Sequence, residues 1–92
     1  MSFDPTIHAP NRLRICGALA GAEELEFGTL RDLLGLSDSA LSKQLTVLVD
    51  AGYVAERRAV RDSRKRLWVG LTAEGRGAFR GHVAALRDIV GD

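Results

Sequence analysis

The chain's 92 residues, 46% of them hydrophobic and 27% charged with a net charge of +1, have the composition of one soluble globular domain spanning 1–92. No apolar run approaches the roughly 18 residues needed to cross a bilayer, and the first residues lack the basic and apolar parts of a secretory signal. We therefore expect a cytoplasmic protein with no membrane partner.

The first part of the chain is predicted to be a tail followed by a helix. Residues 1–9 form the expected N-terminal tail, and the helix begins near Pro10 or Asn11 and ends at Gly21. Its apolar residues recur at spacings of three and four, as one helix face requires: Leu13, Cys16, Leu19 and Ala20.

The single cysteine and the two histidines bear on redox and metal chemistry. Cys16 has no partner for an internal disulfide, and its apolar neighbours favour a buried structural thiol. The nearby Arg12 and Arg14 leave a redox-sensing thiol open as the alternative. Because Cys16 and the histidines, at positions 8 and 82, are scattered along the chain, we expect no metal site and no cofactor.

The middle of the chain reads as a short strand and two helices. Residues 23–27 suit a brief extended segment, and a helix of about two turns then begins at Gly28 or Thr29. Gly35 ends that helix in the left-handed conformation that glycine adopts without strain. After a tight turn, Ser37 or Asp38 caps a third helix over 38–51, which buries one leucine face: Leu41, Leu45 and Leu48.

From Tyr53 the pattern becomes extended and basic. Alternation in 66–71 places Leu67, Val69 and Leu71 on one face, with the turn residues 62–64 before them, so a hairpin is predicted. Its basic segment 57–66 holds six of the 13 lysines and arginines. On the opposite face, Trp68 is expected to pack against the protein rather than stack on a base. Thr72 then caps a last helix over 73–90.

The third helix presents its polar side chains on the face away from the leucines. Ser39, Lys43 and Thr46 lie opposite Leu41 on a helical wheel, and Ser42 and Gln44 flank them. Lysine donates to guanine, glutamine pairs with adenine, and serine or threonine bonds to bases or phosphates. The face therefore suits the DNA major groove, although a solvated helix face has the same composition.

The hairpin offers the second part of a nucleic-acid interface. Arginine at a loop tip contacts phosphates or enters the minor groove, and Asp62 is placed to orient Arg64 through an ion pair. An exposed charge run is often only a solvated surface, but crowded cations repel one another and a bound polyanion offsets that repulsion. The sequence thus predicts these DNA contacts: Ser37, Ser39, Ser42, Lys43, Gln44, Thr46, Arg57, Arg58, Arg61, Asp62, Arg64, Lys65 and Arg66.

Two motifs, one after the other along the chain, resemble those of MarR- and ArsR-type bacterial regulators. The stretch Gly35-Leu36-Ser37-Asp38-Ser39-Ala40-Leu41-Ser42-Lys43-Gln44-Leu45, followed by Ala51-Gly52-Tyr53-Val54, resembles their helix-turn-helix. Asp62-Ser63-Arg64 before Leu71-Thr72-Ala73-Glu74-Gly75 resembles the MarR wing. The resemblance implies a mainly helical winged helix-turn-helix with a small β-wing, a DNA-binding dimer, and Arg64 in the minor groove. The cysteine-rich metal motif of ArsR sensors is absent, and a small-molecule effector is left undecided.

The last helix carries apolar residues at spacings of three and four. They predict either packing on the helix's own domain or a homodimer seam, and we favour the seam because a dimer matches two half-sites. The seam comprises Phe79, His82, Val83, Leu86, Ile89 and Val90. Within it, His82 is expected to be packed rather than to act as a pH switch.

The competing functions are an enzyme and a protein-binding module. No glycine-rich phosphate loop, cysteine–histidine pairing or inward carboxylate pair supports an enzyme. A winged-helix module that sets the basic hairpin on an acidic partner remains the alternative. A protein-binding face normally carries an aromatic or aliphatic anchor, and the outward face of the third helix has nothing larger than Val47. We therefore expect a regulator that binds double-stranded DNA specifically.

Overall fold

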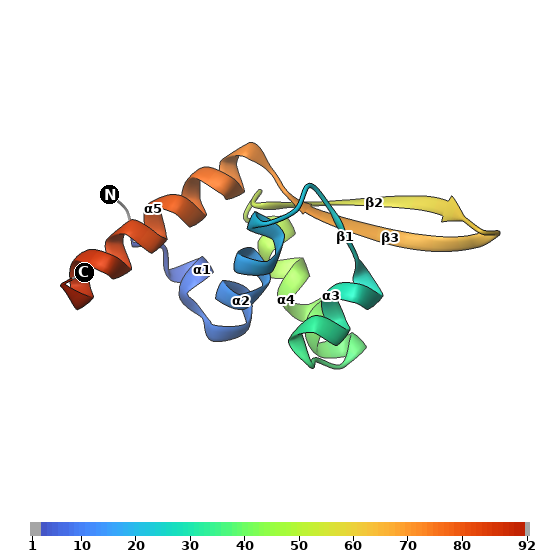
Figure 1. The fold of residues 1–92 in the computed structure, drawn as a ribbon, viewed down its shortest axis with the longest axis horizontal. Coiled ribbons are helices and arrows are strands. Elements are labelled where there is room, and N and C mark those ends of the chain that lie inside the picture. Colours follow the sequence, from blue (N-terminus) through green and yellow to red (C-terminus); the bar gives the residue numbers. More distant parts are fainter. Residues whose placement is uncertain (1–2, 92) are drawn as a thin grey trace.

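The computed structural model describes residues 3–91 and has five helices and three strands in that part of the chain. In chain order they are α1 (Pro5–His8), α2 (Pro10–Ala20), β1 (Leu25–Glu26), α3 (Phe27–Leu34), α4 (Asp38–Asp50), β2 (Val54–Arg61), β3 (Arg64–Leu71) and α5 (Ala73–Val90). Figure 1 shows α2, α3 and α4 clustered together, with the β2–β3 hairpin projecting from one end and α5 running to the other.

The prediction that residues 1–9 form a tail is wrong for the part that forms α1. Asp4 caps this single turn, because its Oδ1 accepts hydrogen bonds from the backbone N–H groups of Thr6 and Ile7. Pro5 occupies the first turn, where its missing N–H costs nothing. Ile7 is fully buried in the core. One buried side chain and one cap therefore fix a segment too short to show helical periodicity; residues 1 and 2 lie outside the described part.

The helix α2 buries Ile15, Cys16 and Leu19 against the other helices. Ile15 was not on the predicted face, and Ala20, which was, is exposed. Burial raises the pKa of the Cys16 thiol to about 11, with Asp4 adding to the rise. The structural interpretation of this cysteine is therefore confirmed, since a buried thiol that stays protonated is a poor nucleophile.

The turn between α3 and α4 has the predicted chemistry. Gly35 adopts a φ of +67°, and the N–H of Leu36 bonds back to the carbonyl of Arg31 at 3.1 Å. Ser37 caps α4, its Oγ accepting a bond from the N–H of Ala40 at 3.1 Å. The three predicted leucines of α4 are at most 1% exposed. These contacts fix the orientation in which α4 turns its other face to solvent.

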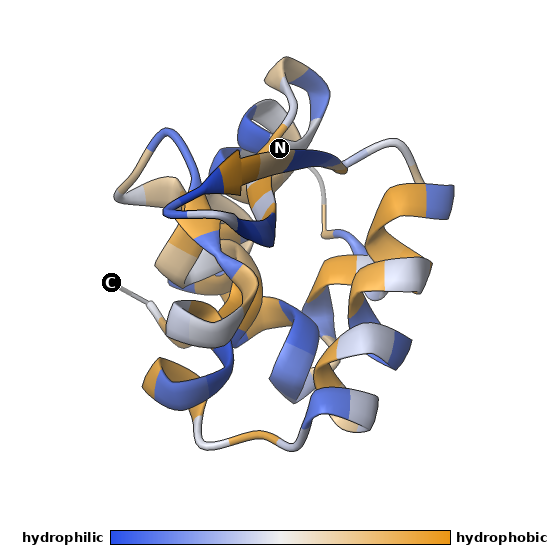
Figure 2. Ribbon diagram, turned by 90° about the vertical axis from the view of Figure 1, so that its right-hand side faces the viewer, coloured by the Kyte–Doolittle hydropathy of each residue, from blue (hydrophilic) through white to orange (hydrophobic). Residues whose placement is uncertain are grey.

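The three strands form an antiparallel sheet in the order β1-β3-β2. Asp62 and Ser63 make a two-residue turn with φ of +52° and +63°, which is the geometry that suits the twist of a tight hairpin. Val69 and Leu71 face the core as predicted, with Leu67 half-buried beside them. In Figure 2, where the hairpin end faces the viewer, hydrophilic and hydrophobic residues alternate along the helices as expected for half-buried elements.

The helix α5 starts on the domain and runs beyond it. Thr72 caps it as predicted, its Oγ1 accepting from the N–H of Gly75 at 2.9 Å. His82 and Ala85 are buried on the inner side, whereas Ile89 and Val90 near the C-terminal end are 68% and 74% exposed. Among the described residues, no helix has the length and hydropathy to cross a membrane.

Candidate nucleic-acid interface

The outward face of α4 is open to solvent, as the sequence predicts. Ser39, Lys43 and Thr46 are exposed, and so is Ser42 beside them. The Thr46 hydroxyl donates to the carbonyl of Ser42 at 3.0 Å, which leaves its oxygen lone pairs outward. No segment of residues 3–91 covers this face, so it is a surface of short hydrogen-bonding groups around one lysine.

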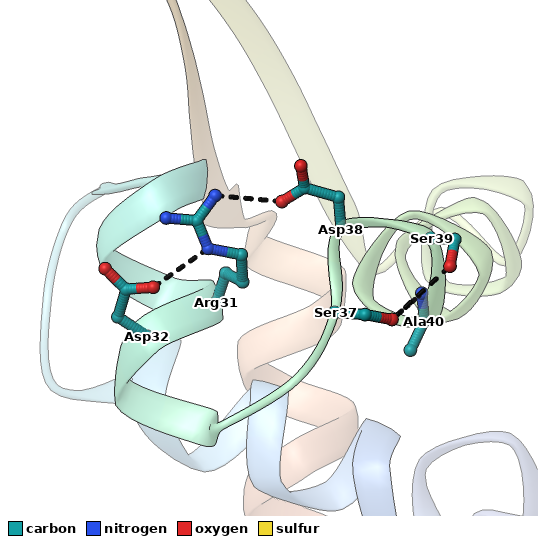
Figure 3. A network of polar contacts seen from close by, with 6 residues as sticks. All are labelled: Arg31, Asp32, Ser37, Asp38, Ser39 and Ala40. Carbon is teal, nitrogen blue, oxygen red and sulfur yellow. Dashed lines mark hydrogen bonds and ion pairs between the residues drawn. The ribbon is translucent and has the colours of Figure 1, made fainter.

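An exposed ion-pair network joins α3 to α4 (Figure 3). The Arg31 guanidinium donates to the carboxylates of Asp32 and Asp38, both at 2.9 Å. The hydrogen bond from Arg31 lowers the pKa of Asp32, and the two carboxylates raise the pKa of Arg31. Exposed ion pairs add little stability, so these contacts supplement the Gly35 turn and the Ser37 cap, which set the position of α4. Sequence reasoning missed this network, although arginine late in one helix and aspartate early in the next is a readable signal.

Gln44 is already engaged by the protein's own chain. Its Oε1 accepts a hydrogen bond from Arg12 Nη1 at 2.8 Å, and Arg12 Nε also donates to the carbonyl of Thr6. The predicted two-point pairing of Gln44 with adenine needs both its oxygen and its nitrogen. The contact directs the Gln44 amide oxygen toward Arg12, so in this structure its oxygen and nitrogen are not both turned outward for that pairing.

Two of the predicted hairpin contacts are held by carboxylates of the β1 segment. Arg57 makes a two-point contact with Glu24 at 3.1 and 2.7 Å, and Arg66 Nη1 lies 2.8 Å from Glu26. The hydrogen bond from Arg57 lowers the pKa of Glu24. These ion pairs were not predicted from the sequence, because the pairing of β1 with β3 is a tertiary contact. The Arg57 guanidinium also lies 5.9 Å from the Trp68 ring centroid, consistent with the predicted packing of that tryptophan.

The cations nearer the hairpin tip remain exposed. They show no ion pair to any residue within 3–91. The predicted ion pair between Asp62 and Arg64 is not formed in this part of the chain; Asp62 instead supplies the left-handed turn. The exposed tip cations are Arg58, Arg61, Arg64 and Lys65.

A groove of about 380 Å³ separates the hairpin from the helices. Arg58 and Lys65 line it from the hairpin, and Gly28, Arg31 and Ser42 line it from α3 and α4. Arg66 also reaches this groove, and its Nε is the one buried side-chain nitrogen or oxygen in residues 3–91 with no hydrogen-bond partner. The exposed cations Arg58 and Lys65 attract a phosphate to this groove, whereas Arg66 is paired with Glu26, which also lines it.

The predicted dimer seam is only partly accessible. His82 is fully covered by the protein's own N-terminal segment, and Phe79 packs on the domain core. The Asp4 backbone N–H donates to His82 Nδ1 at 2.9 Å, and His8 Nδ1 lies 3.2 Å from His82 Nε2. His82 is thus packed, as expected, but against its own domain. Val83 and Leu86 are half-buried, and the seam is fully exposed only toward the C-terminal end of α5.

The polar clusters within residues 3–91 offer no metal centre. No three histidine, cysteine, aspartate or glutamate side chains in this range converge as metal ligands. Within the same residues, α4, the groove and the hairpin tip offer hydrogen-bonding groups and positive charge.

Comparison with known proteins places this arrangement in a family. The model of the winged helix DNA-binding domain matches residues 11–90. An uncharacterised protein of Methanocaldococcus jannaschii is 32% identical over 72 residues, which is 78% of each chain. The structure of a transcriptional regulator homologue from Pyrococcus horikoshii shares the fold, with a TM-score of 0.89 at 23% identity over 94% of this chain and 85% of that one.

A regulator described as MarR-family extends the comparison. The MarR family transcriptional regulator from Silicibacter pomeroyi superimposes with a TM-score of 0.73 at 25% identity, covering 90% of this chain and 53% of that one. The predicted MarR resemblance and winged helix-turn-helix fold are confirmed. The chain belongs to the winged helix DNA-binding domain family.

Proposed function

We propose that this protein is a sequence-specific regulator that reads double-stranded DNA with α4 in the major groove. The hairpin then contacts the phosphates and the minor groove next to it. The observation that carries the proposal is the exposed face of α4, where Ser39, Lys43 and Thr46 stand clear of the rest of the described chain. The major groove, about 12 Å wide, admits one helix with such a face.

The basic groove gives the DNA backbone a path through the interface. A helix in the major groove and a hairpin in the adjacent minor groove lie on opposite sides of one phosphate strand. The groove lies between these two elements, with Arg58 and Lys65 on one wall and Ser42 on the other. Phosphate contacts of this kind set register, whereas Lys43 and its neighbours supply sequence information.

The protein is further proposed to act as a homodimer without catalysis or a cofactor. Two copies joined through the free end of α5 would present two copies of α4 to a two-part operator. The contacts would come from Val83, Leu86, Ile89 and Val90, which the domain does not bury fully. We further propose that this activity takes place in the cytoplasm.

Substitution of Lys43 tests the reading of bases. Lys43→Ala should weaken binding to a selected duplex by roughly 1–3 kcal/mol while changing binding to random DNA much less, because only the selected site offers it a base acceptor. Fluorescence anisotropy with both duplexes at one salt concentration measures the two losses. Arg80→Ala, which removes a charge from the exposed side of α5, is the matched control. Equal losses of binding free energy on both duplexes would mean that Lys43 contacts phosphates and does not read a base.

A further inference from the structure

Arg12 joins three parts of the chain that are distant in sequence. From α2, its Nε donates to the carbonyl of Thr6 in α1, and its Nη1 donates to Gln44 Oε1 in α4 at 2.8 Å. Both Arg12 and Gln44 are half-buried. Thr6 is itself held in place by the Asp4 cap and by the buried Ile7 next to it, so its carbonyl is a fixed acceptor for the Arg12 guanidinium.

The contact settles which way the Gln44 amide points. Arginine has only donors, so the atom that faces it must be the amide oxygen and not the nitrogen. The Gln44 nitrogen makes no hydrogen bond within residues 3–91, and it is not buried, because Arg66 Nε is the one buried unpartnered atom there. Gln44 therefore presents an N–H₂ donor to solvent and keeps its acceptor turned inward.

We propose that Arg12 is a specificity-determining residue, which holds Gln44 as a donor-only reader of a base edge. The proposal rests on the proposed function, in which α4 enters the major groove. A free glutamine favours adenine, because its oxygen accepts from N6 while its nitrogen donates to N7. A donor alone best matches guanine, where N7 and O6 are both acceptors, or thymine, where O4 is one. On adenine it gains only the N7 acceptor and meets the N6 donor beside it, and it gains nothing from the N4 donor of cytosine. Arg12 thus acts through Gln44 and is a positioning residue.

Selection of bound duplexes from a random pool tests this assignment, with wild type and four variants. Gln44→Ala identifies the base position that Gln44 reads, since selectivity there is lost. At that position wild type should enrich guanine or thymine. Arg12→Met frees the amide oxygen and should shift enrichment to adenine by at least about fivefold. Gln44→Glu keeps the contact with Arg12 but presents an acceptor, and should enrich cytosine, whose N4 donates.

Arg14→Met is the matched control. It removes the same charge from the same helix and loosens the neighbouring α3, because Arg14 Nη2 donates to the carbonyl of Leu34 at 2.8 Å. The control should leave the base preference at the Gln44 position unchanged. Thermal unfolding followed by circular dichroism identifies a variant that fails to fold. If Arg12→Met does not fold, the base preference of Gln44→Glu tests the inference in its place, and cytosine is the expected base.

The outcomes separate the inference from the proposed function. If wild type enriches no motif, the proposed function fails and the inference fails with it. If wild type enriches a motif that Gln44→Ala leaves unchanged at every position, Gln44 reads no base and only the inference is overturned. The inference is also overturned if folded Arg12→Met keeps the wild-type preference, or if Gln44→Glu still enriches guanine or thymine.

Discussion

The cations of the hairpin divide into two groups according to their partners. Arg57 and Arg66 are held by Glu24 and Glu26 at the base of the hairpin, whereas Arg58 and Arg61 point to solvent. A cation already paired with a carboxylate has less to gain from a phosphate, because it must first lose its partner. Neighbouring arginines of similar exposure should therefore differ in their contribution to DNA binding.

The salt dependence of binding separates Arg58 from Arg57. Arg58→Ala should reduce the slope of log K against log salt by about 0.9, because one phosphate contact is lost. Arg57→Ala should change the slope less, since it also frees Glu24. Anisotropy titrations at several salt concentrations measure both slopes. Equal reductions in the two variants would mean that Arg57 leaves Glu24 when DNA binds.

Two glycines of α5 provide a matched pair for packing. A Cβ at Gly75 would overlap the backbone carbonyl of Tyr53, whereas a Cβ at Gly77 meets nothing within 4 Å. Gly75→Ala should therefore lower the free energy of unfolding by roughly 1–3 kcal/mol, and Gly77→Ala should raise it by roughly 0.5–1 kcal/mol through helix propensity. Urea unfolding of both variants measures these changes. A stabilised Gly75→Ala would show that this contact is not close in solution.

At the scale of the elements, the N-terminal segment is attached to α5 through a directed hydrogen-bond chain. The Asp4 N–H is a donor, so His82 Nδ1 must accept and its Nε2–H must donate to His8 Nδ1. Phe3 covers both rings, with centroids 4.7 and 4.8 Å away. Asp4 also accepts from the Tyr53 hydroxyl at 2.6 Å, which raises the pKa of Tyr53 to about 12. An added proton on His82 Nδ1 would face the Asp4 N–H and has no acceptor within residues 3–91.

Acid should weaken this attachment. Burial lowers the pKa of His82 from 6.5, and the nearby His8 lowers it further while Asp4 opposes the change. Below about pH 6.5, His82 therefore binds a proton in the unfolded chain but not in the folded chain. The free energy of unfolding consequently falls as the pH drops below about 6.5. Urea unfolding at pH 7.5 and pH 5.5 measures the loss. His82→Asn keeps a side-chain acceptor for Asp4 and should lose less stability on acidification; an equal loss would assign the effect to other groups.

The sequence predicted the elements that local chemistry determines. Gly35, Ser37 and Thr72 marked helix ends through backbone conformation and capping, and these rules act within a few residues. The helix α1 was missed because a single turn has no period to detect. The exposed face of α4 was predictable because the buried leucines fix the opposite side.

The partners of the predicted site residues were not predictable in the same way. Glu24 meets Arg57, and Arg12 meets Gln44, across separations of 33 and 32 residues. Such pairings depend on how β1 joins the sheet and how α2 crosses α4, which no local pattern specifies. The sequence therefore identified which residues form the surface, and the structure identified which of them are free.

On the scale of the whole molecule, the shape separates two functions. The described chain measures 49 × 24 × 21 Å, with the hairpin at one end and the exposed part of α5 at the other (Figure 1). DNA contacts and subunit contacts thus need not compete for the same surface. The exposed apolar residues of α5 lie at the opposite end of the molecule from the hairpin tip. A second copy bound to them would leave the basic groove open.

Sedimentation tests the homodimer. The wild-type protein should sediment at twice its 9.9 kDa monomer mass at micromolar concentration, because burying Ile89 and Val90 in a partner removes apolar surface from water. Ile89→Asp should shift the protein toward the monomer, since the carboxylate would be buried in the seam. Leu33→Asp, which changes an equally exposed apolar residue on α3, should remain dimeric. A monomeric wild type would exclude the seam.

The central claim is that the open face of α4 distinguishes one DNA sequence from others. Its most direct test compares the affinity of the wild-type protein for the duplex enriched from a random pool with that for a scrambled duplex of equal length, at one stated salt concentration. A specific reader should bind the enriched duplex at least about 10³-fold more tightly. A ratio near one would mean that the protein binds DNA through charge alone, and it would contradict base reading by α4.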